Sequence, residues 1–127
     1  MVLPTLYGRE GNTLYVHASS GARSSRLFAS GADVCVAVTH VDGIVYGRSV
    51  FHHSANYRSA VIHGMARTLN SEADKRHGMR VLAEHVVPDA WDYARQPSAK
   101  ELAAVSVRVL DLTEASVKVR TGPGQRG

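Results

Sequence analysis

Cysteine is almost absent from this chain, since Cys35 is the only one among 127 residues and no disulfide can form within one copy. Long apolar runs are also absent, and none approaches the roughly 20 residues that a membrane-spanning helix requires. The chain does not start with a basic stretch leading into an apolar segment, as a secretory signal would. We therefore expect a cytoplasmic protein that does not enter a membrane. Cys35 lies in an apolar run, which favours a small core side chain over a reactive thiol.

The motifs of several common enzyme classes are missing too. There is no Gly-x-Gly-x-x-Gly loop of a dinucleotide-binding fold, no Gly-Lys-Ser/Thr loop of a nucleoside-triphosphate enzyme and no Gly-x-Ser-x-Gly elbow of a hydrolase. Bases exceed acids by 15 to 11, but they are scattered rather than gathered in one block. Aromatic residues do not alternate with bases along a strand, so we do not expect a nucleic-acid partner. Scattered arginine also suits a phosphate-bearing small ligand.

Short segments rich in β-forming residues make up much of the chain. Two hairpins are expected, the first turning at residues 8–12 and the second at residues 41–43, where Asp-Gly is a strong turn signal. Gly64 lies inside a long strand and marks a bulge or bend of the kind that a closing barrel needs. The expected strands are residues 3–7, 13–17, 33–40, 44–51, 57–69, 105–110 and 116–120.

Helices are expected at three places between these strands. Residues 22–29 lack β-branched side chains, and a second, longer helix starts near Ser71 and continues toward Pro88. Ser98 and Glu101 have the spacing of a capping box that starts a third helix. Strands joined by short turns indicate an antiparallel sheet closed into a β-barrel with flanking helices, a mainly β fold. We expect one domain over residues 1–121 and a flexible tail over residues 122–127.

Residues 17–26 combine four serines, a glycine and two arginines between a strand and a helix. The N-terminus of a helix offers unpaired N–H groups to an anion, and arginine and serine side chains add further donors. The alternative is a solvated, serine-rich turn with surface arginines. Residues 17–26 are therefore a candidate phosphate-binding segment, and their composition leaves both interpretations open.

His52 and His53 stand in a second unusual stretch, residues 49–59, which is dense in polar and aromatic groups. Adjacent histidines in extended chain point to opposite faces, and no cysteine or carboxylate lies nearby, so we expect no metal site. A histidine can titrate near neutral pH or donate a hydrogen bond to a ring carbonyl. The alternative is an exposed histidine pair at a barrel rim.

Taken together, these stretches resemble the pyridoxamine phosphate oxidase-like group, in particular its short flavin-nucleotide-binding or nitroimidazole-resistance-type members. The resemblance spans nearly the whole chain. The residues that carry it are 4–8, 14–17, 22–24, 49–54, 56–59, 91–92 and 118–122.

The resemblance implies an FMN-binding split β-barrel that forms a homodimer, with the cofactor at the subunit interface. It implies that Arg23 and Ser24, with Ser25 beside them, hold the FMN phosphate. Further residues match positions that line or reach the cofactor, some of them from the other subunit. These are Thr5, Val16, His17, Arg58, Ser59, Lys118 and Arg120.

The function that follows from the resemblance is an FMN-dependent oxidoreductase acting on a small molecule. His52 or His53 is then the polar group that faces the substrate, and both are our catalytic candidates. The alternative is a binding protein without turnover, for FMN, a deazaflavin or haem. Relatives usually have a helix and a strand ahead of the segment that starts at Pro4, so we expect part of the barrel to be missing here.

Overall fold

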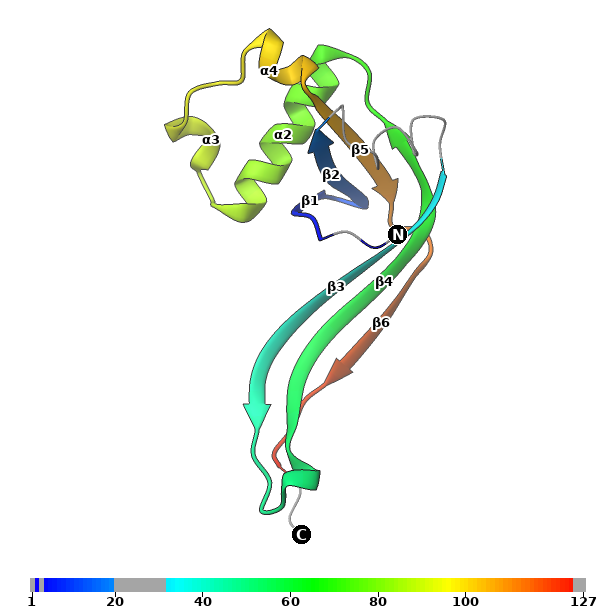
Figure 1. The fold of residues 1–127 in the computed structure, drawn as a ribbon, viewed down its shortest axis with the longest axis vertical. Coiled ribbons are helices and arrows are strands. Elements are labelled where there is room, and N and C mark those ends of the chain that lie inside the picture. The colour runs from blue at the N-terminus through cyan, green and yellow to red at the C-terminus, as the bar shows by residue number, and fades with distance from the viewer. Residues whose placement is uncertain (1, 3, 20–31, 125–127) are drawn as a thin grey trace. The chain divides into compact units, whose positions relative to one another are not determined.

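The computed structural model describes residues 2, 4–19 and 32–124, without the side chains of Ala18, Ser19 and Ala32 (Figure 1). Contacts divide the chain into two compact units. Unit 1 comprises Met1–Val34 and Gly64–Thr113, and unit 2 comprises Cys35–His63 and Glu114–Gly127. The described elements are β1 (Tyr7–Glu10), β2 (Thr13–Ser19), β3 (Ala32–Val45), the 3-10 turn η1 (Val50–His52), β4 (Ser54–Thr68), α2 (Glu72–Val86), α3 (Ala90–Tyr93), α4 (Ala99–Ala103), β5 (Val105–Asp111) and β6 (Ala115–Arg120).

The first hairpin is confirmed, but its turn is shorter and later than the sequence indicates. β1 and β2 pair antiparallel from Tyr7 opposite Val16 to Glu10 opposite Thr13, and Gly11 takes a positive φ of 58° in the turn. Gly8 belongs to β1 rather than to the turn because it packs on helix α2. A Cβ at Gly8 would lie 2.8 Å from the carbonyl oxygen of Val81, so only glycine allows this approach.

The second expected hairpin is wrong, because β3 runs without a break from Ala32 to Val45. Gly43 has no positive φ, which a two-residue hairpin turn at Asp-Gly would require. Asp42 instead accepts hydrogen bonds from Arg58 on the neighbouring strand β4, at 3.1 Å from each of its carboxylate oxygens. Cys35, expected in the core, is exposed on β3 with its Sγ 3.8 Å from Nε2 of His63.

Strand β4 changes partner along its length, and Gly64 lies between the two pairings. Residues Tyr57 to Ile62 pair with β6 in unit 2, whereas Arg67 and Thr68 pair with β5 in unit 1. A Cβ at Gly64 would come within 2.7 Å of Cδ1 of Leu110. The long strand is confirmed, and this glycine serves close packing at the point where the pairing changes.

The longest helix, α2, forms as the sequence predicts and covers strands β1, β2 and β5 of unit 1 (Figure 1). The hydroxyl of Ser71 accepts a hydrogen bond from the N–H of Asp74 and caps the helix. No helix among the described residues is both long and apolar enough to cross a membrane. The apolar core that α2 completes is Tyr15, Val81, Leu82, Val107 and Val109, with Leu69, Met79 and Val105 packed against it.

The capping box at the third expected helix is confirmed. The Ser98 hydroxyl accepts from the N–H of Glu101, and the Glu101 carboxylate accepts from the N–H of Ser98. Strands β5 and β6 follow close to their expected positions. The helix expected over residues 22–29 lies outside the described residues.

Candidate functional site

One polar face of unit 2 carries three of the predicted cofactor-binding residues. The antiparallel register of β4 and β6 places Ser59 opposite Lys118 and Tyr57 opposite Arg120, and side chains opposite each other share a face. The Lys118 ammonium lies 5.9 Å from the centroid of the Tyr57 ring, within reach of a cation–π interaction. We call Tyr57, Ser59, Lys118 and Arg120 the β4–β6 face.

Arg120 is held in place at the end of this face. Its Nη1 donates to the carbonyl oxygen of Ala55 at 3.2 Å and to Oδ1 of Asn56 at 2.8 Å. The amide of Asn56 donates in turn to the carbonyl oxygen of Gly122. The strand end is therefore fixed by hydrogen bonds around a half-buried guanidinium, while Lys118 stays exposed.

Arg58, another predicted contact, does not share the face of its neighbour Ser59. Adjacent residues of a strand point to opposite sides, and the Arg58 guanidinium forms an ion pair with Asp42. Arg58 and Ser59 therefore cannot both line one side of the sheet.

The two candidate catalytic histidines lie where β3 leads into β4. His52 ends the 3-10 turn η1, and its N–H donates to the carbonyl oxygen of Ser49. His52 packs edge-on against Phe51 with ring centroids 5.2 Å apart, and His53 packs edge-on against Tyr46 at 5.6 Å. A tight turn with aromatic neighbours thus replaces the extended strand end that the sequence predicts, and His53 is the more exposed of the two.

Unit 1 carries three more predicted contacts, which the structure does not bring onto one face. Thr5 is exposed ahead of β1, and its hydroxyl donates to the carbonyl oxygen of Leu6. Val16 and His17 are adjacent on β2, so their side chains point to opposite sides of the sheet. Nδ1 of His17 is buried and has no hydrogen-bond partner among the described residues. A buried nitrogen without a partner is costly unless a ligand or water satisfies it.

Arg23, Ser24 and Ser25, the predicted phosphate contacts, lie outside the described residues. Arg108 on β5 is a residue that the sequence analysis missed. It is buried and pairs in register with Val16 on one side and Thr68 on the other. Burial lowers the pKa of its guanidinium. The sequence signal for it was its position in the middle of the mainly apolar residues 105–110, because arginine is rarely buried in a strand of this kind.

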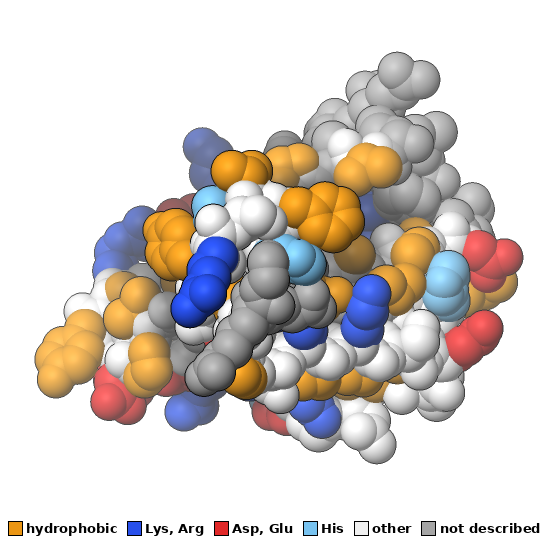
Figure 2. Space-filling view, turned by 90° about the horizontal axis from the view of Figure 1, so that it is seen from below, with side chains coloured by type: hydrophobic (Ala, Val, Ile, Leu, Met, Phe, Trp, Pro, Cys, Tyr) orange, Lys and Arg blue, Asp and Glu red, His pale blue; other side chains and the backbone are white. Residues whose placement is uncertain are grey.

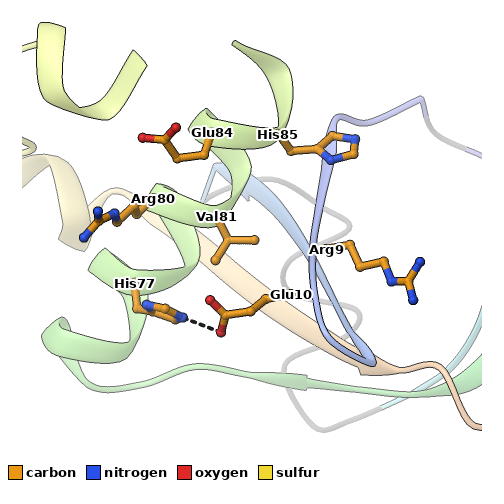
Figure 3. A pocket seen from close by; sticks show the side chains of 7 residues that line it. All are labelled: Arg9, Glu10, His77, Arg80, Val81, Glu84 and His85. Carbon is orange, nitrogen blue, oxygen red and sulfur yellow. Dashed lines mark hydrogen bonds and ion pairs between the residues drawn. The ribbon is translucent and has the colours of Figure 1, made fainter. Parts of the chain in front are cut away.

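A hollow of about 510 Å³ opens between β1 and α2 of unit 1 (Figure 3). In it, Nε2 of His77 and a carboxylate oxygen of Glu10 lie 2.8 Å apart and link the two elements. Burial, followed by the charge of Glu10, raises the pKa of the nearby Tyr15 hydroxyl. None of the described residues that the sequence predicts for the site lines this hollow, whose described wall is made of Arg9, Glu10, His77, Arg80, Val81, Glu84 and His85.

Large apolar side chains are exposed at the η1 end of unit 2. Phe51 is 89% exposed and Val50 82%, and Tyr46 is also largely exposed. The space-filling view shows hydrophobic side chains beside basic side chains and histidines on this surface (Figure 2). We call Tyr46, Val50 and Phe51 the η1 apolar cluster. Clusters of this kind are characteristic of surfaces that contact another molecule.

The solved structures that are similar to this chain include the following three. The flavocytochrome Anf3 from Azotobacter vinelandii is 37% identical, with a TM-score of 0.85 over 98% of this chain and 58% of its own. The FAD and heme binding protein from Mycobacterium smegmatis is 33% identical, with a TM-score of 0.86 over 97% of this chain and 60% of its own. A putative 5-nitroimidazole antibiotic resistance protein from Bacteroides thetaiotaomicron is 20% identical, with a TM-score of 0.75 over 92% of this chain and 67% of its own. That last likeness concerns the fold alone.

The chain therefore spans about three fifths of the length of the first two relatives. No curated protein sequence matches it. The mainly antiparallel fold with flanking helices matches the split β-barrel that the sequence predicts. A family model described as pyridoxamine 5'-phosphate oxidase matches residues 1–119. The chain belongs to this pyridoxamine 5'-phosphate oxidase family.

Proposed function

We propose that this protein binds a flavin nucleotide, with FMN the form expected from the sequence, and acts as a flavin-dependent oxidoreductase on a small molecule. The observation that carries the proposal is the family match over residues 1–119. It is supported by two relatives above 30% identity, one named a flavocytochrome and the other an FAD and heme binding protein.

The residues present fit a flavin nucleotide in two respects. Lys118 has no carboxylate partner among the described residues, so its charge is available to a phosphate. The buried Nδ1 of His17, which has no hydrogen-bond partner in the described part of the chain, is the kind of polar atom that a ligand group satisfies. The predicted phosphate contacts Arg23, Ser24 and Ser25 would add a second group of donors.

A bound flavin supplies the redox chemistry by accepting and returning hydride or electrons, and the protein supplies position and electrostatics. In this role His52 or His53 would offer an imidazole to the substrate. Of the two, His53 is more exposed and lies edge-on to Tyr46, which restricts its ring. We therefore favour His53 as the residue that contacts substrate.

We also propose that the protein forms a homodimer, as the resemblance implies. The η1 apolar cluster supports this, because side chains as exposed as Phe51 gain about 2 kcal/mol or more on burial. The variant Phe51→Ser should weaken self-association and leave the fold unchanged. Analytical ultracentrifugation over a range of concentrations measures this, with Tyr93→Ser, an exposed aromatic of unit 1, as the control. A wild-type chain that stays monomeric at every concentration would refute the dimer.

The flavin proposal is tested by the visible absorbance of the purified chain, before and after incubation with FMN. We expect a retained flavin spectrum after gel filtration and its bleaching by a nicotinamide donor or dithionite. Reoxidation by candidate acceptors then separates an oxidoreductase from a protein that only binds the cofactor. A chain that retains no flavin under any loading condition would contradict the proposal.

A second candidate function is haem binding without turnover. The names of the two relatives above 30% identity favour it, since one is called a flavocytochrome and the other an FAD and heme binding protein. His52 and His53 offer the imidazole that commonly holds haem iron. Titration with hemin should shift the Soret band in wild type and fail to do so in His53→Ala or His52→Ala, with the exposed His40→Ala as control. An unshifted band in wild type would exclude this candidate.

A further inference from the structure

We propose that the hollow between β1 and α2 of unit 1 is a separate ligand site, which binds a small aromatic carboxylate. The guanidinium of Arg80 holds the carboxylate. Three residues of α2, His77, Val81 and His85, support the ring, and we call them the α2 stripe. This inference goes beyond the proposed flavin function, because none of the described residues predicted to contact a flavin lines the hollow. The residues that line it all belong to unit 1.

Arg80 is the cation of this wall that remains available to an anion. Its usual partner on a helix would be Glu84, which lies four residues further along α2. Oε2 of Glu84 instead accepts a hydrogen bond from the N–H of Asp89 at 2.7 Å. Among the described residues, no hydrogen bond or ion pair engages Arg80. A guanidinium in this state can form two parallel, charge-assisted hydrogen bonds with a carboxylate.

The other charged side chains of the wall are engaged by the chain or point elsewhere. A carboxylate oxygen of Glu10 lies 2.8 Å from Nε2 of His77. Nε of Arg9 donates to the carbonyl oxygen of Gly11 at 2.8 Å, and Figure 3 shows the Arg9 side chain pointing away from α2. Because each carboxylate of the wall already contacts a donor of the chain, the two oppose an incoming anion less than free acids would. Arg80 therefore favours a negatively charged ligand group.

The α2 stripe provides a support for a planar ring. His77, Val81 and His85 are spaced four residues apart, so their side chains lie along one side of the helix. Val81 is buried, whereas both histidines are exposed. The centroid of the His85 ring lies 4.4 Å from that of Tyr7, and the centroid of the His77 ring lies 6.0 Å from that of Tyr15. Two imidazoles held by aromatic neighbours, with an apolar side chain between them, favour an aromatic ligand.

The size of the hollow agrees with a ligand of this kind. Its volume of about 510 Å³ lies within the range of roughly 300–1,000 Å³ that is typical of sites for small organic molecules. Acetate or inorganic phosphate would fill only a small part of it. An aromatic carboxylate supplies both the charge that Arg80 binds and the planar body that the α2 stripe supports.

The test adds benzoate to the full chain and follows the amide signals of residues 77–85 in two-dimensional NMR spectra. We expect these signals to shift saturably. Benzamide, which has nearly the same shape without the charge, should bind about tenfold or more weakly, because it loses the charge-assisted hydrogen bonds. Acetate, which lacks the ring, should bind about threefold or more weakly.

Two kinds of variant locate the anion. Arg80→Gln should lower the affinity for benzoate about tenfold or more. Arg48→Gln, which removes an exposed arginine of unit 2, should leave it nearly unchanged, and so should Arg9→Gln in the wall of the hollow. The dispersion of the NMR signals shows whether each variant is folded.

The outcomes decide the inference independently of the flavin function. It is wrong if benzoate causes no saturable shift of residues 77–85, or if benzamide or acetate binds as tightly as benzoate. It is also wrong if Arg80→Gln binds benzoate as well as Arg48→Gln does. A flavin titration of the same samples keeps the two proposals apart, since a chain that binds benzoate but no flavin supports this site while the flavin function fails.

Discussion

Unit 1 and unit 2 differ in how much of their apolar surface they bury. In unit 1, Val107 is 0% and Leu102 2% exposed, and helix α2 covers three strands. In unit 2, the buried apolar residues among those described are only Val45 and Ile62, while Val117 on β6 is 71% exposed. A three-stranded sheet with so few buried apolar side chains gains little from burial on its own. We infer that unit 1 stabilises the fold and that unit 2 presents surfaces for binding.

The largest expected effect comes from truncating a core residue of unit 1. Leu102→Ala should lower the free energy of unfolding by about 2–5 kcal/mol, because it removes buried methyl groups and leaves a cavity. Val117→Ala in unit 2 should change it by less than about 0.5 kcal/mol, because the side chain is already exposed. Urea denaturation measures both. Equal losses for the two variants would break the contrast between the units.

A smaller loss of unfolding free energy is expected for a substitution where β1 packs on α2. Gly8→Ala places a methyl group 2.8 Å from the carbonyl oxygen of Val81, and backbone cannot move aside as a flexible side chain can. We expect a loss of about 1–3 kcal/mol from this overpacking. Gly43→Ala in unit 2 is the matched control, since no atom of the described residues lies within 4 Å of the added Cβ and the φ of Gly43 is not positive. A neutral Gly8→Ala would show that the contact is loose.

The exposed ion pair between Arg58 and Asp42 in unit 2 should contribute still less to the free energy of unfolding. Asp42→Asn removes the partner of Arg58, and pairs this exposed contribute about 0–1 kcal/mol. The same variant releases Arg58 from its ion pair, so it tests the role of Arg58 in flavin binding as well as in stability. If Arg58 contacts the flavin, its release should change flavin affinity more than stability. Chemical denaturation and a flavin titration on the same sample distinguish the two roles.

The smallest effect is a pH dependence at the capping box of α4. Hydrogen bonds from Arg95 and from Ser98 lower the pKa of Glu101 from 4.5 to about 2. A carboxyl whose pKa is lower in the folded state adds stability above its ordinary pKa, and this stability is lost as the pH falls toward 2. Glu101→Gln should therefore be slightly less stable than wild type at neutral pH and equal to it near pH 2. Melting temperatures over this range check the convergence.

Local sequence signals predicted helices α2 and α4 and most of the described strands correctly, but they missed the short helix α3. The caps at Ser71 and Ser98, and the Glu101 partner of Ser98, could be predicted because their hydrogen bonds join residues only three positions apart. The Asp-Gly signal at residues 42–43 failed for the opposite reason. Its outcome depends on Arg58, which is distant in sequence and engages Asp42 across the sheet. A local turn signal can therefore fail where a residue of the expected turn is hydrogen-bonded to a neighbouring strand.

The candidate site was only partly predictable. The sequence selects residues such as Ser59 and Lys118, but the β4–β6 register is needed to place them opposite each other. The resemblance also assigns both Val16 and His17 to the cofactor site, although neighbouring residues of strand β2 point to opposite sides of the sheet. Arg108 was missed because burial of a charge is decided by packing between strands rather than by neighbours in sequence.

The central claim is that this chain binds a flavin, and one titration tests it most directly. The ligand-free protein is titrated into FMN and, separately, into FAD while flavin fluorescence and visible absorbance are followed. We expect saturable quenching and a shifted absorbance band with at least one of the two, at one flavin per chain. Fluorescence and absorbance that stay those of free FMN and free FAD at every protein concentration would contradict the claim.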